Sequence, residues 1–253
     1  MIEREDVDGV AVLSLAHGKV NALDLELLRA ITEAFTALDG DTCGAVVITG
    51  SGRAFSAGVD LWRVVEGGPE YVEAFLPALS EAFLAIFDLG RPVVAAINGH
   101  AIAGGAIVAC AADHRLMAEG GGRFGVPELH VGVPFPLSAL EILGYAVGGP
   151  AARRAILAAG TVPPALALAQ GLVDEVVAPE SLLDAATARA RALATRIPAD
   201  TYRLTKAQLH APVHERLARD RPTMDPLTLR LWCERVADGG IRRYMEQVTA
   251  RRT

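Results

Sequence analysis

The sequence predicts an α/β fold in which a parallel sheet is buried between helices. Short aliphatic runs bounded by glycine occur at residues 10–15 and 45–49, and such runs are typical of buried strands. Between them, residues 24–38 carry apolar side chains at helical spacing behind Asp24, which is a favourable N-cap. Because strands that alternate with helices pair in parallel, the β-α-β pattern predicts this fold class.

The rest of the chain continues the pattern and then changes character. A helix over residues 71–88 leads into a strand at 93–97, a glycine-containing turn and another helix, and further strands are expected at 115–117 and 173–177. From residue 179 onward the periodicity is helical only. We therefore divide the chain into a core, residues 1–195, and a helical C-terminal region, residues 196–253. The helices expected at the C-terminal end are 181–196, 201–210, 226–237 and 241–250.

The composition is that of a globular protein without a general affinity for polyanions. Hydrophobic residues make up 51% and charged residues 21% of the 253 residues, so neither disorder nor a fibrous structure is indicated. With 24 basic and 30 acidic residues the net charge is −6, which argues against sequence-independent binding to nucleic acid or to an anionic membrane.

Cysteine usage and hydropathy point to a cytoplasmic protein. The three cysteines are far apart and form no CxxC pair, as expected for reduced thiols. The N-terminus is acidic and has no apolar signal core. Residues 93–112 are apolar, but Asn98, His100 and a run of glycines interrupt them, so we expect no membrane span. No histidines, cysteines or acids have metal-ligand spacing, and no metal is expected.

Two turns rich in small residues are the best candidates for a functional site. One covers residues 54–61 after a predicted strand, and the other covers residues 98–106 between a strand and a helix. Small residues let the backbone approach a ligand and leave amide groups unpaired, and the start of a helix adds a positive end. Two such turns can direct two N–H donors at one oxygen atom.

Three segments in order give the sequence a family resemblance. AFSAGVDL, INGHAIAGGAIVACAAD and FGVPELHVGV resemble the signatures of the crotonase (enoyl-CoA hydratase/isomerase) superfamily. The resemblance implies a ClpP-like spiral of repeated β-β-α units with helical oligomerisation elements at the C-terminal end. It also implies an acyl-CoA thioester substrate, no cofactor apart from the coenzyme A of that substrate, and a homotrimer or a dimer of trimers.

The resemblance also implies a set of site residues. The amides of Val59 and Gly104 would form an oxyanion hole for the thioester carbonyl, and Glu128 would be the carboxylate that faces the acyl carbons. A single oxyanion donor is typically worth about 3 to 4 kcal/mol in the transition state. The residues expected to bind substrate or coenzyme A are Ala57, Asp60, Leu61, Gly105 and Lys19.

One position bears on which reaction is catalysed. Hydratases of the family use a second glutamate on the helix after the glycine turn, where this chain has Ile107. An aliphatic side chain cannot hold water or exchange a proton, so a double-bond shift is favoured, because one carboxylate is enough for it. The segments VNALDLELL and VPFPL also resemble mitochondrial-type Δ3,Δ2-enoyl-CoA isomerases. Two alternatives stay open: a hydratase, in which Glu128 acts alone or with another acid such as Glu141, and a non-catalytic acyl-CoA binding protein.

Other polar residues are given structural interpretations. The apolar neighbours of Glu128 are expected to raise its pKa toward neutrality. Asp113 lies at a helix C-terminus, where an acid is unfavourable unless it is paired, so we predict a structural partner for it. We assign no role to His100 and His130. Ser56 and Ser138 lack a GxSxG elbow, and neither turn is a dinucleotide or P-loop motif.

Overall fold

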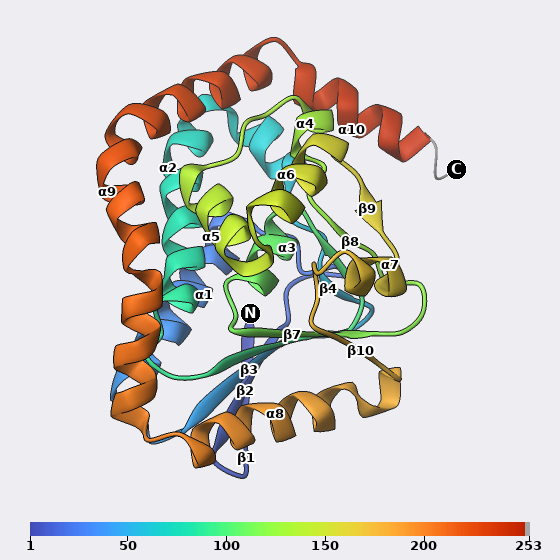
Figure 1. Ribbon diagram of the computed structural model, residues 1–253. Coiled ribbons are helices and arrows are strands. Elements are labelled where there is room, and N and C mark those ends of the chain that lie inside the picture. The colour runs from blue at the N-terminus through green and yellow to red at the C-terminus, as the bar shows by residue number, and fades with distance from the viewer. Residues whose placement is uncertain (251–253) are drawn as a thin grey trace.

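The main sheet has six strands in the order β1-β2-β3-β5-β7-β10 (Figure 1). The structure is a computed structural model and describes residues 1–250. Strand β1 is antiparallel to β2, and the other neighbours are parallel. The central strands β3 and β5 are covered on both faces, which explains their unbroken aliphatic sequences. The strands are β1 (Ile2–Val7), β2 (Val10–Leu15), β3 (Ala45–Gly50), β5 (Val93–Ile97), β7 (His114–Ala118) and β10 (Glu175–Val177).

A smaller sheet lies beside the main one and has the order β4-β6-β8-β9. Its strands β4, β6 and β8 each follow a strand of the main sheet and precede a helix, which gives the units β3-β4-α2, β5-β6-α3 and β7-β8-α4. The predicted spiral of β-β-α units is therefore confirmed. The small sheet consists of β4 (Ala54–Ser56), β6 (His100–Ile102), β8 (Phe124–Gly125) and β9 (Thr161–Val162).

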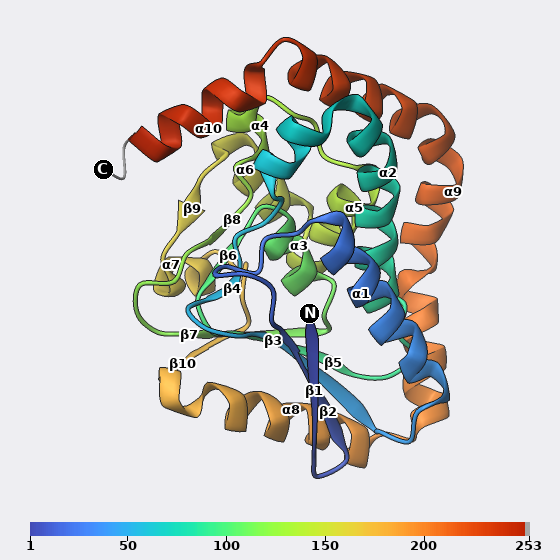
Figure 2. The ribbon, with the colours of Figure 1, turned by 180° about the vertical axis from the view of Figure 1, so that it is seen from behind.

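Helices cover the main sheet on both faces. Figures 1 and 2 show α8 along one face and the other large helices on the opposite side. Alanines of α8, including Ala186 and Ala190, pack on Val12 and Val47, whereas the larger hydrophobic cluster fills the other side. The helices are α1 (Leu25–Ala37), α2 (Leu61–Phe87), α3 (Gly104–Cys110), α4 (Glu128–Val131), α5 (Leu137–Val147), α6 (Gly149–Ala158), α7 (Pro164–Ala169), α8 (Leu182–Arg196), α9 (Ala199–Ala237) and α10 (Gly240–Ala250), with 3₁₀ turns at Leu38–Gly40 and Pro179–Ser181.

Helix α2 begins ten residues before the predicted start at 71. Asp60 caps it by accepting hydrogen bonds from the amides of Trp62 and Arg63, both at 3.1 Å. At Gly68 the backbone is not helical (φ 70°, ψ −166°), so α2 consists of two helical segments joined by a kink, and the second segment corresponds to the helix predicted at 71–88. The first segment therefore begins directly after the first glycine-rich turn, and the second leads toward the central strand β5.

Helix α9 is continuous where two separate helices, 201–210 and 226–237, were predicted. It passes through Pro212, Pro222 and Pro226, each of which removes one helical hydrogen bond. The helix packs along α2 and α5 through a buried stripe that includes Val213 and Trp232, and this packing offsets the loss. The predicted boundary at 195 falls at the end of α8. The oligomerisation role of the C-terminal helices stays a prediction.

Asp113 has the structural partners that its position required. Its Oδ2 atom accepts hydrogen bonds from the Val93 amide at 2.8 Å and from the Lys206 ammonium at 2.9 Å. Lys206 is itself buried, so the ion pair fastens α9 to the end of α3 and the start of β5. Leaving one charge without the other would be strongly unfavourable in this position.

Candidate active site

The first glycine-rich turn leaves the Val59 amide without a backbone partner. Leu23 bridges the turn: its N–H donates to the Gly58 carbonyl at 2.8 Å, and its carbonyl accepts from the Asp60 amide at 2.9 Å. Since Leu23 bonds to the residues on either side of Val59, the N–H of Val59 itself faces away from Leu23. Among residues 1–250, no acceptor takes the Val59 amide hydrogen bond.

The second turn presents the first amides of α3. Gly104 opens the helix, so its N–H has no acceptor within α3. The preceding Ala103 has φ 53° and ψ −125°, a conformation that L-residues rarely adopt, and a bond from its amide to the Gly125 carbonyl at 2.8 Å holds it there. Such backbone strain is common where a ligand must be met in one fixed geometry.

The two turns touch each other through their glycines. A Cβ atom on Gly58, where φ is +86°, would lie 2.4 Å from the Ile102 carbonyl oxygen, and one on Gly105 would lie 2.4 Å from the Ser56 oxygen. A Cβ on Gly104 would lie 3.7 Å from Cγ2 of Val59. The glycines thus allow the backbones to approach closely, and they place the unpaired amides of Val59 and Gly104 on neighbouring parts of one wall.

Both turns border a cavity of about 390 Å³. Of the predicted site residues, six line this cavity, and they come from the first turn, α3 and α4. Lys19 does not line it: this lysine is exposed, although its neighbour Val20 reaches the cavity. Gly105 is buried against the backbone of β4 and serves the packing of the two turns. The six residues are Ala57, Val59, Asp60, Leu61, Gly104 and Glu128.

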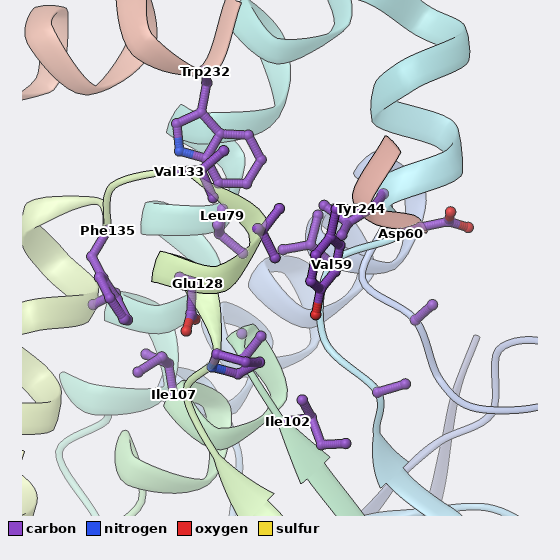
Figure 3. A pocket seen from close by; sticks show the side chains of 18 of the residues that line it. Val59, Asp60, Leu79, Ile102, Ile107, Glu128, Val133, Phe135, Trp232 and Tyr244 are labelled. Atoms are coloured by element: carbon purple, nitrogen blue, oxygen red, sulfur yellow. The ribbon is translucent and has the colours of Figure 1, made fainter. Parts of the chain in front are cut away.

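Glu128 is the acidic side chain inside this cavity. It begins α4, is only 9% exposed, and its Oε2 atom has no hydrogen-bond partner among the described residues. Figure 3 shows its carboxyl group between Ile107 and Phe135, whereas the Asp60 carboxylate points outward. Burial among apolar side chains raises the pKa of Glu128 to about 8, as the sequence suggested in direction.

No second carboxylate accompanies Glu128 in the interior of the cavity as residues 1–250 form it. Ile107, at the position where the sequence resemblance places the second glutamate of hydratases, is 1% exposed and lies against Glu128 (Figure 3). Glu141 does not line the cavity and instead forms an ion pair with Arg216 at 3.2 Å. His100 and His130 also lie outside the lining. The arrangement suits proton transfer by one carboxyl group in an apolar space.

Sequence reasoning missed the contribution of the C-terminal helices. Trp232 of α9 and the α10 residues Tyr244, Met245 and Val248 complete the cavity wall. The Trp232 indole donates to the Pro134 carbonyl at 2.9 Å, and the Tyr244 hydroxyl points into the cavity beside Val59 (Figure 3). The spacing of the three α10 residues, which share one helical face, was a usable signal.

Glu128→Gln is expected to stabilise the protein at neutral pH. The folded-state pKa is raised from 4.5 to about 8, so the folded chain holds a proton that the unfolded chain has lost, and stability falls as pH rises through this interval. The glutamine side chain carries an uncharged amide group that does not ionise, so the variant does not lose stability over this pH interval. We expect a gain in unfolding free energy of about 2 to 3 kcal/mol at pH 7.

Denaturant unfolding of both proteins between pH 4 and 8 measures this difference. The gain should disappear below about pH 4.5, where the wild-type carboxyl group is protonated in both states. A difference between the two proteins that does not change with pH would contradict the assigned ionisation.

Residues 1–250 contain no group of three histidine, cysteine or acidic side chains placed to hold a metal ion. Within the same residues, no helix is both long enough and apolar enough to cross a bilayer.

Comparison with known proteins places the chain in a family. Residues 5–251 match the enoyl-CoA hydratase/isomerase family. The mitochondrial enoyl-CoA delta isomerase 1 of Homo sapiens is 33% identical over 225 residues, which cover 87% of this chain and 74% of that protein. A putative enoyl-CoA hydratase of Thermus thermophilus is 38% identical over 195 residues, 76% of each chain.

Solved structures agree with this assignment. The crystal structure of human mitochondrial Δ3-Δ2-enoyl-CoA isomerase superposes with a TM-score of 0.87 at 28% identity and covers 99% of this chain and 97% of that one. A probable enoyl-CoA hydratase from Mycobacterium tuberculosis superposes with a TM-score of 0.77 at 30% identity, covering 99% and 95%. This chain therefore belongs to the enoyl-CoA hydratase/isomerase family of the crotonase superfamily.

Proposed function

We propose that this protein is an enoyl-CoA isomerase that converts 3-enoyl-CoA thioesters into 2-enoyl-CoA thioesters. The observation that carries the proposal is the single carboxyl group of Glu128 in an apolar cavity, with Ile107 where a hydratase needs its second acid. The human relative is named an isomerase, which supports the same assignment, whereas several bacterial relatives are named hydratases.

The reaction needs one group that both accepts and returns a proton. The ionised Glu128 removes a proton from C2, and the electron pair moves to give a dienolate whose negative charge lies largely on the thioester oxygen. The amides of Val59 and Gly104 donate to that oxygen. The protonated Glu128 then delivers its proton to C4, the double bond comes to lie between C2 and C3, and the carboxylate is restored. No water molecule takes part.

The pKa of Glu128 suits this double role. A carboxylate with an ordinary pKa is a weak base toward a carbon acid, whereas a pKa of about 8 lies close to physiological pH and permits proton transfer in both directions. The apolar cavity also strengthens the hydrogen bonds from the two amides to the developing charge. In the proposal, the coenzyme A moiety passes the backbone at Ala57, Asp60 and Leu61, and its phosphates lie toward Lys19.

Separate assays with a 3-enoyl-CoA and with crotonyl-CoA test the proposal. We expect the 3-enoyl-CoA to be converted to the conjugated 2-enoyl-CoA, which its ultraviolet absorbance reports. Crotonyl-CoA should yield little or no 3-hydroxyacyl-CoA in chromatography of the products. Rapid hydration of crotonyl-CoA would instead establish the hydratase, and tight acyl-CoA binding without turnover of either thioester would favour a binding protein.

A further inference from the structure

The buried side chain of Ser56 ties the first glycine-rich turn to the segment that precedes α1. Its Oγ atom donates a hydrogen bond to the Asn21 carbonyl at 2.7 Å and accepts one from the Gly58 amide at 3.2 Å. A hydroxyl group has one proton to donate and two lone pairs, so both bonds form at once. Ser56 does not line the cavity, and any contribution that it makes to the reaction must therefore pass through the turn.

Asn21, which receives the Ser56 hydroxyl, is itself held firmly. Its side chain is fully buried, and Nδ2 donates to the carbonyl groups of Ala54 at 2.9 Å and Phe55 at 3.2 Å in β4. Its Oδ1 atom accepts a hydrogen bond from the His17 amide at 2.9 Å. The backbone of Asn21 has φ 50°, a left-handed conformation that asparagine tolerates better than most residues. The carbonyl group of Asn21 is thus a fixed anchor for the turn.

Gly58 is the residue of the turn that most needs such an anchor, because glycine is free to rotate about both of its dihedral angles. The Leu23 amide holds the carbonyl of Gly58 at 2.8 Å, and in a trans peptide group the N–H of Val59 points the opposite way from that carbonyl. The peptide group before Gly58 is held at its N–H by Ser56 alone, since no other acceptor among residues 1–250 takes this amide. The two bonds together fix the direction of the Val59 amide.

We infer that Ser56 is a positioning residue, whose hydroxyl group keeps the Val59 amide directed at the thioester oxygen. The inference rests on the proposed function for the identity of that oxygen. Hydrogen-bond donors stabilise a developing charge best when they need no reorientation during the reaction. Without the hydroxyl, the peptide group before Gly58 is free to turn, and the donor is misdirected for part of the time. The loss should therefore fall on the transition state more than on ground-state binding.

Ser56→Ala tests this role, and Thr49→Val is its matched control. The buried Thr49 hydroxyl also donates to a main-chain carbonyl, that of Ala96 at 2.8 Å, but Thr49 does not line the cavity. Both variants should lower the denaturation midpoint to a similar extent, because each loses one buried hydrogen bond. We expect S56A to lower kcat roughly 10- to 100-fold with hexanoyl-CoA affinity nearly unchanged, and T49V to keep both values. A folded S56A protein with the kcat of T49V would overturn the inference.

Infrared spectroscopy of bound hexanoyl-CoA, labelled with carbon-13 at its carbonyl carbon, provides a readout that needs no turnover. Hydrogen bonds to the carbonyl oxygen weaken the double bond and lower its stretching frequency. We expect the same shift in the wild type and in T49V, and a loss of about half of this shift in S56A, because one of the two donors is misdirected. A change confined to protein stability would leave the frequency of the bound carbonyl where it is in the wild type.

The two measurements separate this inference from the proposed function. An infrared shift in S56A as large as that of the wild type would overturn the positioning role of Ser56. If the wild type isomerises no 3-enoyl-CoA but its carbonyl shift still depends on Ser56, the proposed function falls and the positioning role stands. If S56A does not fold, Ser56→Cys provides the same test, because a thiol is only a weak donor and acceptor. An undiminished shift in S56C would count equally against the inference.

Discussion

Glu128→Gln is expected to slow the isomerisation step by roughly 10³- to 10⁴-fold, measured as kcat, while the protein still binds acyl-CoA. Both proton transfers pass through this one carboxyl group, and no other acid lines the described part of the cavity except Asp60, whose carboxylate caps α2 and points outward. The amide has nearly the same shape but is not a base. Steady-state kinetics together with calorimetry of a saturated acyl-CoA separate catalysis from binding.

Glu141→Gln serves as the control for this experiment. Glu141 is paired with Arg216 and lies outside the cavity lining, so its replacement should leave kcat within about twofold of the wild type. A loss in E141Q as large as that in E128Q would indicate a two-acid mechanism and favour hydration. Activity of E128Q within tenfold of the wild type would exclude Glu128 as the proton carrier.

The second large effect is expected for Gly58→Ala. The new methyl group would lie 2.4 Å from the Ile102 carbonyl oxygen at a position where φ is +86°. Relief of this clash must move the first turn away from the second, and this would displace the amides of Val59 and Gly104 from the positions that the proposed oxyanion hole requires. We expect kcat/KM to fall by about 10² to 10³, the loss typical of one oxyanion donor. Unfolding free energy should fall by about 3 kcal/mol from strain and overpacking together.

Gly52→Ala separates the effect of backbone strain at a positive φ from the effect of the clash between the two turns. Gly52 also has a positive φ, of +73°, but a Cβ there has open space, with no other atom within 4 Å. The control should therefore lose only about 1 kcal/mol of stability from backbone strain and keep its activity. Kinetics and denaturant unfolding of both variants make the comparison. Normal turnover in a folded G58A protein would show that the contact between the turns does not position the donors.

Much of this site could be predicted because its chemistry lies in the backbone of short segments. A turn that brings two main chains together needs glycine, and the glycines at 58 and 105 mark the two places where this occurs. The run of apolar residues around Glu128 likewise indicated the direction of its pKa shift. These are local signals, and each can be read within about ten residues.

The features of the fold and of the site that the sequence did not predict depend on contacts between residues far apart in the chain. Trp232 reaches the cavity only because α9 runs unbroken through three prolines, and local propensity argues against such a helix. The start of α2 was placed too late because Gly67 and Gly68 resemble a loop, although packing keeps the segment helical on both sides of the kink. The two-residue strand β8 is too short to leave a pattern of its own.

The surroundings of Glu128 also determine where its hydrogen can go. Oε2 of Glu128 lies among apolar side chains and is bonded to no described neighbour, so no described side chain stands next to it to pass its proton on. Under the proposed isomerisation, we therefore expect much of the hydrogen taken from one end of the allylic system to be delivered to the other end. An isotope placed at C2 would travel with its own molecule to C4, and the enzyme would move atoms within a substrate without mixing them with those of the medium.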